Sequence, residues 1–157
     1  MTEFAPTQES GNRIRRTRAI ILTGRGTILF IKRVKPQGEP YWVAPGGGME
    51  AQDPTLLDAL HRELCEELGA SVEVLEHAFV LEHTMGGKDL EEHFYVCRLL
   101  DYDLSLRSGP EFNDPGRGEF IPHEVELHTD AINALNIKTP ELRDWLLANI
   151  PDLRHVS

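Results

Sequence analysis

The sequence predicts an α+β fold in which helices pack on a mixed β-sheet. Short apolar runs rich in β-branched residues occur mostly in pairs around glycine turns, which indicates hairpins rather than a purely parallel sheet. Two other segments repeat leucine at three- and four-residue steps, which indicates amphipathic helices. The chain has 157 residues, which is the length of one domain.

The composition is that of an ordinary globular protein, with 40% hydrophobic and 27% charged residues. No apolar run approaches the roughly 20 residues that a membrane helix needs, and no secretory signal is visible at the N-terminus. Cys65 and Cys97 are too few for a disulfide framework. We therefore expect a reduced, cytoplasmic setting, a flexible tail over residues 1–12 and a single domain over residues 13–157.

The first half of the chain predicts a hairpin, a short strand and a helix. Apolar runs at 19–22 and 27–31 flank a glycine turn, which is the pattern of a β-hairpin. A short strand is expected at 41–43. A helix follows up to Leu68, with Asp53 or Thr55 as its N-cap and Gly69 as its C-cap. Its expected apolar face consists of Leu57, Leu60, Leu64 and Leu68.

The second half predicts two longer strands and a final helix. Strand-like runs at 72–81 and 93–100 are separated by a glycine-containing loop at 84–88. Several glycines and prolines make 105–118 an irregular loop, and Phe120 begins another short element. The last helix is expected from Thr139 to Asn149, ending at Pro151 because proline lacks the backbone N–H that a helix needs.

The net charge of −10, from 16 basic and 26 acidic residues, argues against duplex nucleic acid as a partner, because proteins that bind a duplex normally present a basic surface. An acidic protein binds a polyanion only through local basic residues or through a bridging divalent cation. The acidic segments of the chain are therefore candidates for metal binding.

Three glutamates share one side of the first predicted helix, since Glu63, Glu66 and Glu67 stand at positions i, i+3 and i+4. Like charges at this spacing repel one another, and acids near a helix C-terminus oppose the helix dipole. Arg62 supplies a single cation against these three anions. A hard cation such as Mg²⁺ explains the arrangement, because it prefers carboxylate oxygens. A solvated acidic face is the alternative, and for the triplet alone it is the commoner one.

A triple glycine, Gly46, Gly47 and Gly48, precedes this helix. Glycine allows a backbone carbonyl or amide to approach a metal or a phosphate closely, although a tight turn would also account for one or two glycines. The conjunction of three glycines, an acidic link and an Arg-Glu-x-x-Glu-Glu helix is much rarer than either part alone. This conjunction favours a site over a solvated face.

With these residues the sequence resembles a Nudix hydrolase. The family pattern is Gly, five residues, Glu, seven residues, then Arg-Glu-apolar-x-Glu-Glu-x-Gly-apolar. The second half is complete from Arg62 to Gly69, with Ala70 in the final apolar position. In the first half, Gly47 is followed after five residues by Asp53 instead of Glu, and eight residues rather than seven then lead to Arg62. The box thus spans residues 47–70 with a one-residue insertion.

The resemblance implies an α/β/α sandwich and hydrolysis of a nucleoside diphosphate derivative with Mg²⁺ or Mn²⁺. It assigns metal binding to Gly46, Glu63, Glu66 and Glu67, and catalysis to Glu63, Arg62 and Glu66. The general base stays open between Glu63 and an acid outside the box, Glu91 or Glu92. The role of Asp53 also stays open, because helix capping alone would account for an acid there.

Candidate substrate contacts are Arg33, Tyr41, Trp42 and Glu92. Each has a structural alternative: a surface charge for the arginine, core packing for the aromatic rings and an exposed strand end for the glutamate. The proline and the tyrosine that distinguish two Nudix subgroups downstream of the box are both absent from residues 84–88. The resemblance therefore favours a nucleoside triphosphate or another small nucleotide as the partner.

A non-catalytic Nudix-fold module that senses nucleotides or binds proteins is the alternative function. No duplex nucleic acid and no membrane are expected as partners, and a homodimer is left open.

Overall fold

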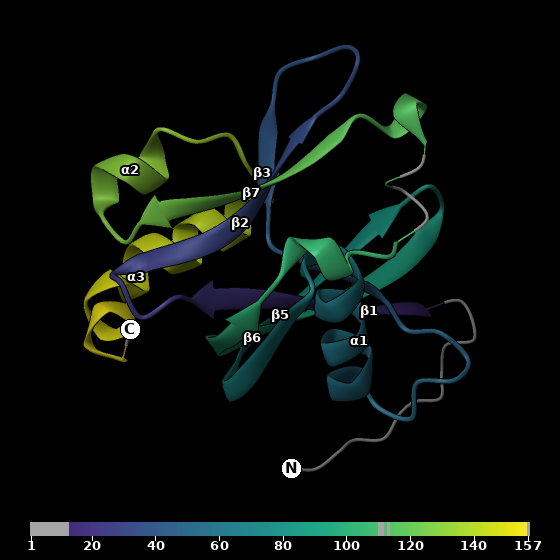
Figure 1. Cartoon of the computed structure of the whole chain (residues 1–157), viewed down its shortest axis with the longest axis horizontal. Helices are drawn as coiled ribbons and strands as arrows, with labels where there is room; N and C mark the ends of the chain where they lie inside the picture. Colours follow the sequence, from purple (N-terminus) through teal and green to yellow (C-terminus); the bar gives the residue numbers. More distant parts are fainter. Residues whose placement is uncertain (1–12, 110–111, 113, 157) are drawn as a thin grey trace.

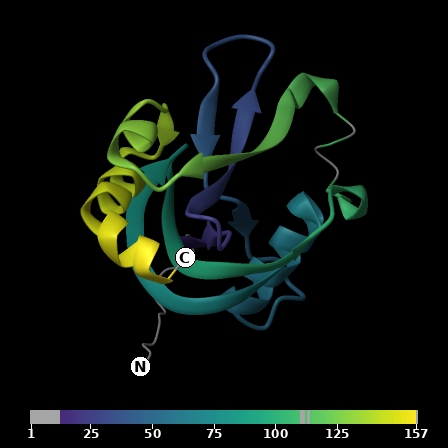
Figure 2. The ribbon, with the colours of Figure 1, turned by 60° about the vertical axis from the view of Figure 1, so that its left-hand side comes forward.

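The computed structural model describes residues 13–109, 112 and 114–156. Its described part is a curled, mixed β-sheet with helices on both faces, which confirms the predicted α+β class and sandwich (Figures 1 and 2). The tail predicted at residues 1–12 lies outside the described residues.

Within this part, eight strands form one sheet: β1 (Arg13–Leu22), β2 (Thr27–Val34), β3 (Tyr41–Val43), β4 (Gly46–Gly48), β5 (Ala70–Met85), β6 (Lys88–Tyr102), β7 (Glu119–Glu126) and β8 (Ile137–Lys138). Their order is β5-β6-β1-β2-β3-β8, with β4 added on β1 and β7 on β2. The β1–β6 and β3–β8 pairs are parallel, and the other pairs are antiparallel. The sheet is therefore mixed, as the hairpin-rich sequence predicts.

The predicted hairpin is present, with Ile21 opposite Leu29 in the β1–β2 pair. The expected loop at 84–88 is shorter than predicted, because both strands continue to a two-residue turn at Gly86 and Gly87. Both glycines have positive φ, at 61° and 79°. Two consecutive positive φ values match the right-handed twist of the flanking strands, so they permit the tight turn.

Helix α1 (Leu56–Leu68) begins and ends as predicted by two of its candidate caps. Thr55 accepts a hydrogen bond from the Asp58 amide at 3.1 Å, and Gly69 closes the helix in a left-handed conformation with φ of 60°. The predicted apolar face is wrong at Leu57, which is 40% exposed. The buried face instead follows Leu56, Ala59, Leu60, Leu64 and Leu68, because the four-residue steps back from Leu68 lead to Leu56.

Each face of the sheet has its own apolar core. On one face, α1 packs its leucines against Ala19 and Ile21 of β1. On the other, α2 (Thr129–Asn133) and α3 (Pro140–Val156) cover Ile20 and Leu22 of the same strand. The alternation of β1 therefore serves both cores, which accounts for its continuous apolar run in sequence.

The end of α3 corrects the prediction that Pro151 stops the last helix. The helix continues to Val156 with Pro151 inside it. Beyond the proline, Leu153 is buried in the core, and Arg154 Nε donates to the Leu127 carbonyl at 2.7 Å. These tertiary contacts outweigh the local cost of one missing backbone donor.

The described residues in and beside the predicted irregular region include the 3₁₀ turns η1 (Leu104–Leu106) and η3 (Pro115–Arg117). No helix in the described part of the chain is long and apolar enough to span a bilayer.

Candidate active site

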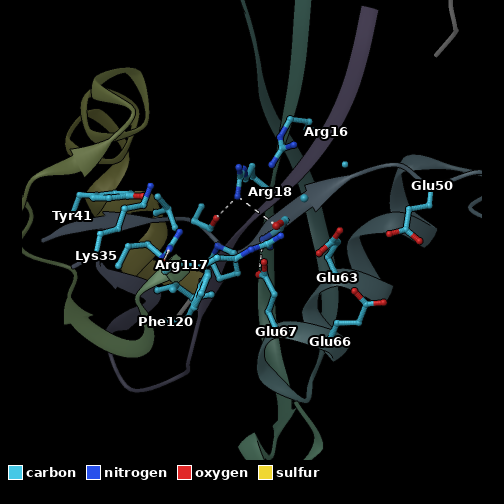
Figure 3. Close-up of a pocket in the computed structure, with 18 of the residues that line it drawn as sticks. Arg16, Arg18, Lys35, Tyr41, Glu50, Glu63, Glu66, Glu67, Arg117 and Phe120 are labelled. Carbon is cyan, nitrogen blue, oxygen red and sulfur yellow. Dashed lines mark hydrogen bonds between the residues drawn. The ribbon is translucent and has the colours of Figure 1, made fainter. Parts of the chain in front are cut away.

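A pocket of about 650 Å³ lies between α1, the glycine strand β4 and the β2–β3 end of the sheet. Glutamates form its acidic wall, and arginines and a lysine form its basic wall (Figure 3). The charged lining residues are Arg16, Arg18, Arg33, Lys35, Glu50, Glu63, Glu66, Glu67 and Arg117. Tyr41 and Phe120 are the aromatic residues of the lining.

The acidic wall comes from α1 and from the link before it. The spacing of Glu63, Glu66 and Glu67 places all three carboxylates on the pocket side of the helix, away from its buried leucines. Glu50 joins them from the link. The side chain of Glu63 is 13% exposed and that of Glu66 is 34% exposed, so this face is not the fully solvated one of the alternative interpretation.

The three glycines form strand β4 rather than the tight turn considered for them. Gly46 has φ of +148°, and a Cβ there would lie 2.0 Å from the Thr17 carbonyl oxygen. A Cβ on Gly47 would lie 2.4 Å from Glu63 Oε2. Glycine at these two positions therefore lets β4 approach both β1 and the acidic wall. The Gly46 amide also donates to Glu67 Oε1 at 3.0 Å, which fixes that carboxylate.

Arg62 is held by Asp53 through a bidentate pair, with Nε–Oδ1 at 3.0 Å and Nη2–Oδ2 at 2.8 Å. Its Nη2 also donates to the Gly48 carbonyl at 3.1 Å. Hydrogen bonds from Arg62 keep the pKa of Asp53 below its ordinary value, and the same contacts raise the pKa of Arg62. Asp53 thus anchors Arg62, and the helix cap is Thr55 instead.

From this anchored position Arg62 reaches the acidic wall. Its Nη1 lies 3.2 Å from Glu66 Oε1 and 3.4 Å from Glu63 Oε2. Arg62 therefore pairs with two glutamates of the acidic wall at once. A guanidinium fixed by an aspartate and a carbonyl can hold a carboxylate in one orientation.

Glu92 lies in the middle of β6 and not at an exposed strand end. Its side chain is 7% exposed and pairs with Arg16 at 3.1 Å and Arg18 at 3.2 Å. Burial alone would raise the pKa of Glu92, but Arg18 and Arg16 outweigh it and lower the pKa. Glu92 is not among the lining residues of the pocket, so the lining does not support the predicted substrate contact. It instead holds in place two arginines that do line the pocket.

Glu91 belongs to a separate network. It pairs with Arg13 at 2.5 Å and Arg15 at 3.3 Å, and its Oε1 accepts a hydrogen bond from His93 Nε2 at 2.9 Å. Burial would raise the pKa of Glu91, but His93 and Arg13 lower it. Like Glu92, it does not line the pocket.

Most of the basic wall was not predicted from the sequence. Arg16 and Arg18 in β1, and Lys35 and Arg117 in loops, all line the pocket together with the expected Arg33. The sequence did carry a signal for the first two, because arginines two residues apart in a strand share one side of it. No comparable signal marks Lys35 or Arg117.

The two aromatic candidates in β3 lie in different places. Tyr41 lines the pocket. Trp42 does not: it packs against the core beneath α3, and its Nε1 donates to His123 Nδ1 at 2.9 Å. Side chains of successive strand residues point to opposite sides, so the structure favours core packing, the alternative interpretation, for Trp42.

The acidic wall suits a hard divalent cation, because such cations prefer oxygen ligands. Its carboxylate oxygens lie in the same pocket lining as the glycine strand β4, whose backbone carbonyls are further oxygen ligands. Over the described residues, no group of three or more His, Cys, Asp and Glu side chains is arranged closely enough to hold a metal by itself. Mg²⁺ usually takes only one or two carboxylates and completes its shell with water and substrate phosphates. The wall fits that mode of binding rather than a closed protein cage.

Comparison with known proteins identifies the family. The model of the NUDIX domain matches residues 13–142, which span the sheet, α1 and the start of α3. The chain therefore belongs to the NUDIX domain family, and the protein is a Nudix hydrolase. Members of this family generally use divalent metals and act on small nucleotides.

Solved structures show the same fold. A NUDIX hydrolase from Nitrosomonas europaea superposes with a TM-score of 0.66 at 16% identity, over 92% of this chain and 89% of that one. A MutT protein from Methanosarcina mazei Go1 gives 0.63 at 19% identity, over 93% and 97%. An ADP-ribose pyrophosphatase from Streptococcus suis gives 0.57 at 21% identity, over 86% and 90%. No curated protein matches the sequence.

Proposed function

We propose that this Nudix hydrolase cleaves a phosphoanhydride bond in a nucleoside triphosphate or another small nucleotide, with Mg²⁺ or Mn²⁺ as its cofactor. The observation that carries the proposal is one pocket with a carboxylate wall facing an arginine wall. A pyrophosphate group carries several negative charges, so it needs cations on both sides. The arginines supply them on one side, and only a bound metal can supply them on the other.

The metal would be held by Glu63, Glu66 and Glu67 with the Gly46 carbonyl, the four groups that the resemblance to the family implies. When bound, it neutralises phosphate charge and lowers the pKa of a coordinated water. The fixed position of the Glu67 carboxylate, given by the Gly46 amide, supports this assignment.

The protein's own groups would position the reaction. Arg16 and Arg18 bind the phosphates from β1, and Arg62 orients Glu63 and Glu66. Glu63 is our candidate for the general base. The two outside candidates, Glu91 and Glu92, are engaged with arginines and do not line the pocket, which supports this choice.

The experiment is hydrolysis of a nucleotide panel with Mg²⁺, in water labelled with ¹⁸O, followed by mass analysis of both products. We expect label in one product of a cleaved phosphoanhydride, no turnover with excess EDTA and poor turnover of phosphate monoesters. Monoesters lack the second phosphate that a site for pyrophosphate holds.

The matched variants are Glu63→Gln and, as control, Glu141→Gln at the exposed start of α3. Loss of a general base or ligand should lower kcat by at least about 100-fold, whereas the control should keep its rate. Undiminished turnover in EDTA would exclude the metal mechanism. A folded protein that binds nucleotides with Mg²⁺ but never cleaves them would instead support the non-catalytic module.

A further inference from the structure

The end of the pocket away from the acidic wall carries a cluster of cations that phosphoanhydride cleavage alone does not require. Arg33, Lys35 and Arg117 line this end together with Tyr41. In Figure 3, Lys35, Arg117 and Tyr41 lie on one side and Glu63, Glu66 and Glu50 on the other, with the side chain of Arg18 between them. We call Arg33, Lys35 and Arg117, together with Lys138 of β8, the distal cation cluster; the Lys138 Nζ lies 4.6 Å from the centre of the Tyr41 ring, although Lys138 does not itself line the pocket.

The charges of this cluster are poorly neutralised. Arg33 donates from Nε to the Glu119 carbonyl and from Nη2 to the Arg117 carbonyl, and neither contact cancels its charge. Among the described residues, no carboxylate forms an ion pair with Arg33 or Lys35. Arg117 pairs with Asp114 at 3.4 Å, but both side chains are more than half exposed, so the pair is weak.

The arginines at the other end of the basic wall differ in this respect. Arg16 and Arg18 share the buried carboxylate of Glu92. Their pair is already partly balanced before any ligand binds, whereas the distal cation cluster is not. In a chain of net charge −10, an unbalanced group of four cations is a specific feature and not a consequence of composition.

The aromatic rings beside the cluster are occupied by the same cations. Lys138 Nζ lies 4.6 Å from the centre of the Tyr41 ring, with Lys35 at 5.8 Å and Arg33 at 5.9 Å. The Arg33 guanidinium lies 3.7 Å from the centre of the Phe120 ring. Cations over a ring face take the place that a stacked nucleobase would need. This end of the pocket is therefore built to recognise negative charge.

We infer that the distal cation cluster is a second anion subsite, which binds a phosphate monoester carried by the substrate at a position remote from the scissile phosphoanhydride. The inference rests on the proposed function, because it assumes that the pyrophosphate lies at the acidic wall. It narrows the substrate class to nucleotides that carry a further phosphate outside the pyrophosphate group, such as one on a ribose 2′- or 3′-hydroxyl.

The test compares substrates that differ by that phosphate alone: NADPH with NADH, and coenzyme A with 3′-dephospho-coenzyme A. For at least one pair, kcat/KM should be about tenfold or more higher for the phosphorylated member, the scale of one charge-assisted contact. The difference should lie in KM, because the contact is present before and during the reaction.

Lys35→Ala should remove the preference, and Lys88→Ala at the exposed start of β6 should retain it. Equal kcat/KM for both members of both pairs in the wild-type protein would overturn the subsite while leaving phosphoanhydride cleavage intact.

Equilibrium binding of the same pairs to protein with Ca²⁺ in place of Mg²⁺ decides the inference without turnover. About tenfold tighter binding of a phosphorylated member, lost in Lys35→Ala, supports the subsite even if no nucleotide is cleaved. Equal binding of both members overturns it.

Discussion

Tyr41 and Trp42 are neighbours in β3, yet they belong to different parts of the molecule. Tyr41 lies among the cations of the pocket, and Trp42 packs in the core and bonds to His123. We expect Trp42→Ala to lower the free energy of unfolding by about 3 kcal/mol, the lower end for deletion of a large aromatic side chain, since Trp42 is only half-buried. Urea denaturation measures this change.

The matched variant is Tyr41→Leu, which keeps apolar volume but removes the ring from the cations. It should change KM for anionic substrates while unfolding stays close to wild type. Unaltered stability with a raised KM in Trp42→Ala would contradict the core role and would support a substrate contact for Trp42.

Single residues also show what the sequence could reveal about the site. The glutamates of α1 were predictable because helical spacing converts a linear pattern directly into a shared face. The roles of Asp53 and Lys35 could not be predicted, because each depends on a contact made by tertiary packing. Asp53 pairs with Arg62, and Lys35 lies over the Tyr41 ring in the distal cation cluster. Arg16 and Arg18 fall between these cases, since strand alternation places them together but does not show what they face.

At the scale of elements, two neighbouring glycines of strand β4 have different roles: one is required for the packing of the fold and the other for the geometry of the acidic wall. A Cβ on Gly46 would collide with the backbone of Thr17, whereas a Cβ on Gly47 would meet only the end of the Glu63 side chain. We expect Gly47→Ala to leave thermal unfolding nearly unchanged and to reduce kcat by about tenfold or more, because displacement of a reacting group by an ångström is that costly.

Gly46→Ala is the comparison, and it should lower the melting temperature clearly because backbone cannot move aside as a side chain can. Thermal unfolding and kcat measured on both variants test the contrast. Full activity in Gly47→Ala would show that the position of Glu63 is not critical.

Elements with strong local signals were predicted well. Helix α1 carries a leucine pattern, an N-cap threonine and a C-cap glycine, so its type and both ends followed from the sequence. The short elements α2 and β8 carry no such signals, and they exist because they pack against α3 and β3. The predicted helix end at Pro151 was wrong for the same reason. Tertiary contacts of the residues after the proline outweigh its local preference to end a helix.

At the scale of the whole molecule, the buried pairing of Glu92 with Arg16 and Arg18 links β6 to β1 and predicts acid sensitivity. The pKa of Glu92 is lowered in the folded protein. Its stabilisation is therefore present above the unfolded-state pKa of 4.5 and is lost as pH falls through the lower folded value. Unfolding free energy measured from pH 7 down to pH 3 should fall less steeply in Glu92→Gln than in the wild type.

At pH 7 the same variant should be destabilised by about 3 kcal/mol, because two partly buried arginines lose their shared carboxylate. Glu82→Gln is the control, since that side chain is 65% exposed and its removal should alter neither quantity appreciably. Parallel pH profiles of Glu92→Gln and wild type would contradict the assignment.

The parallel pairing of β1 with β6 also has a consequence for how the chain folds during synthesis. Arg16 and Glu92 are 76 residues apart, and the centre of the sheet closes only when both strands are available. A growing chain thus releases α1 and its glutamates from the ribosome before β6 exists to complete the sheet around them. Pairings over such separations make folding slow compared with local contacts. Until then, the apolar side of α1 lacks much of its packing surface, which makes this interval the one in which the nascent protein most needs protection from aggregation.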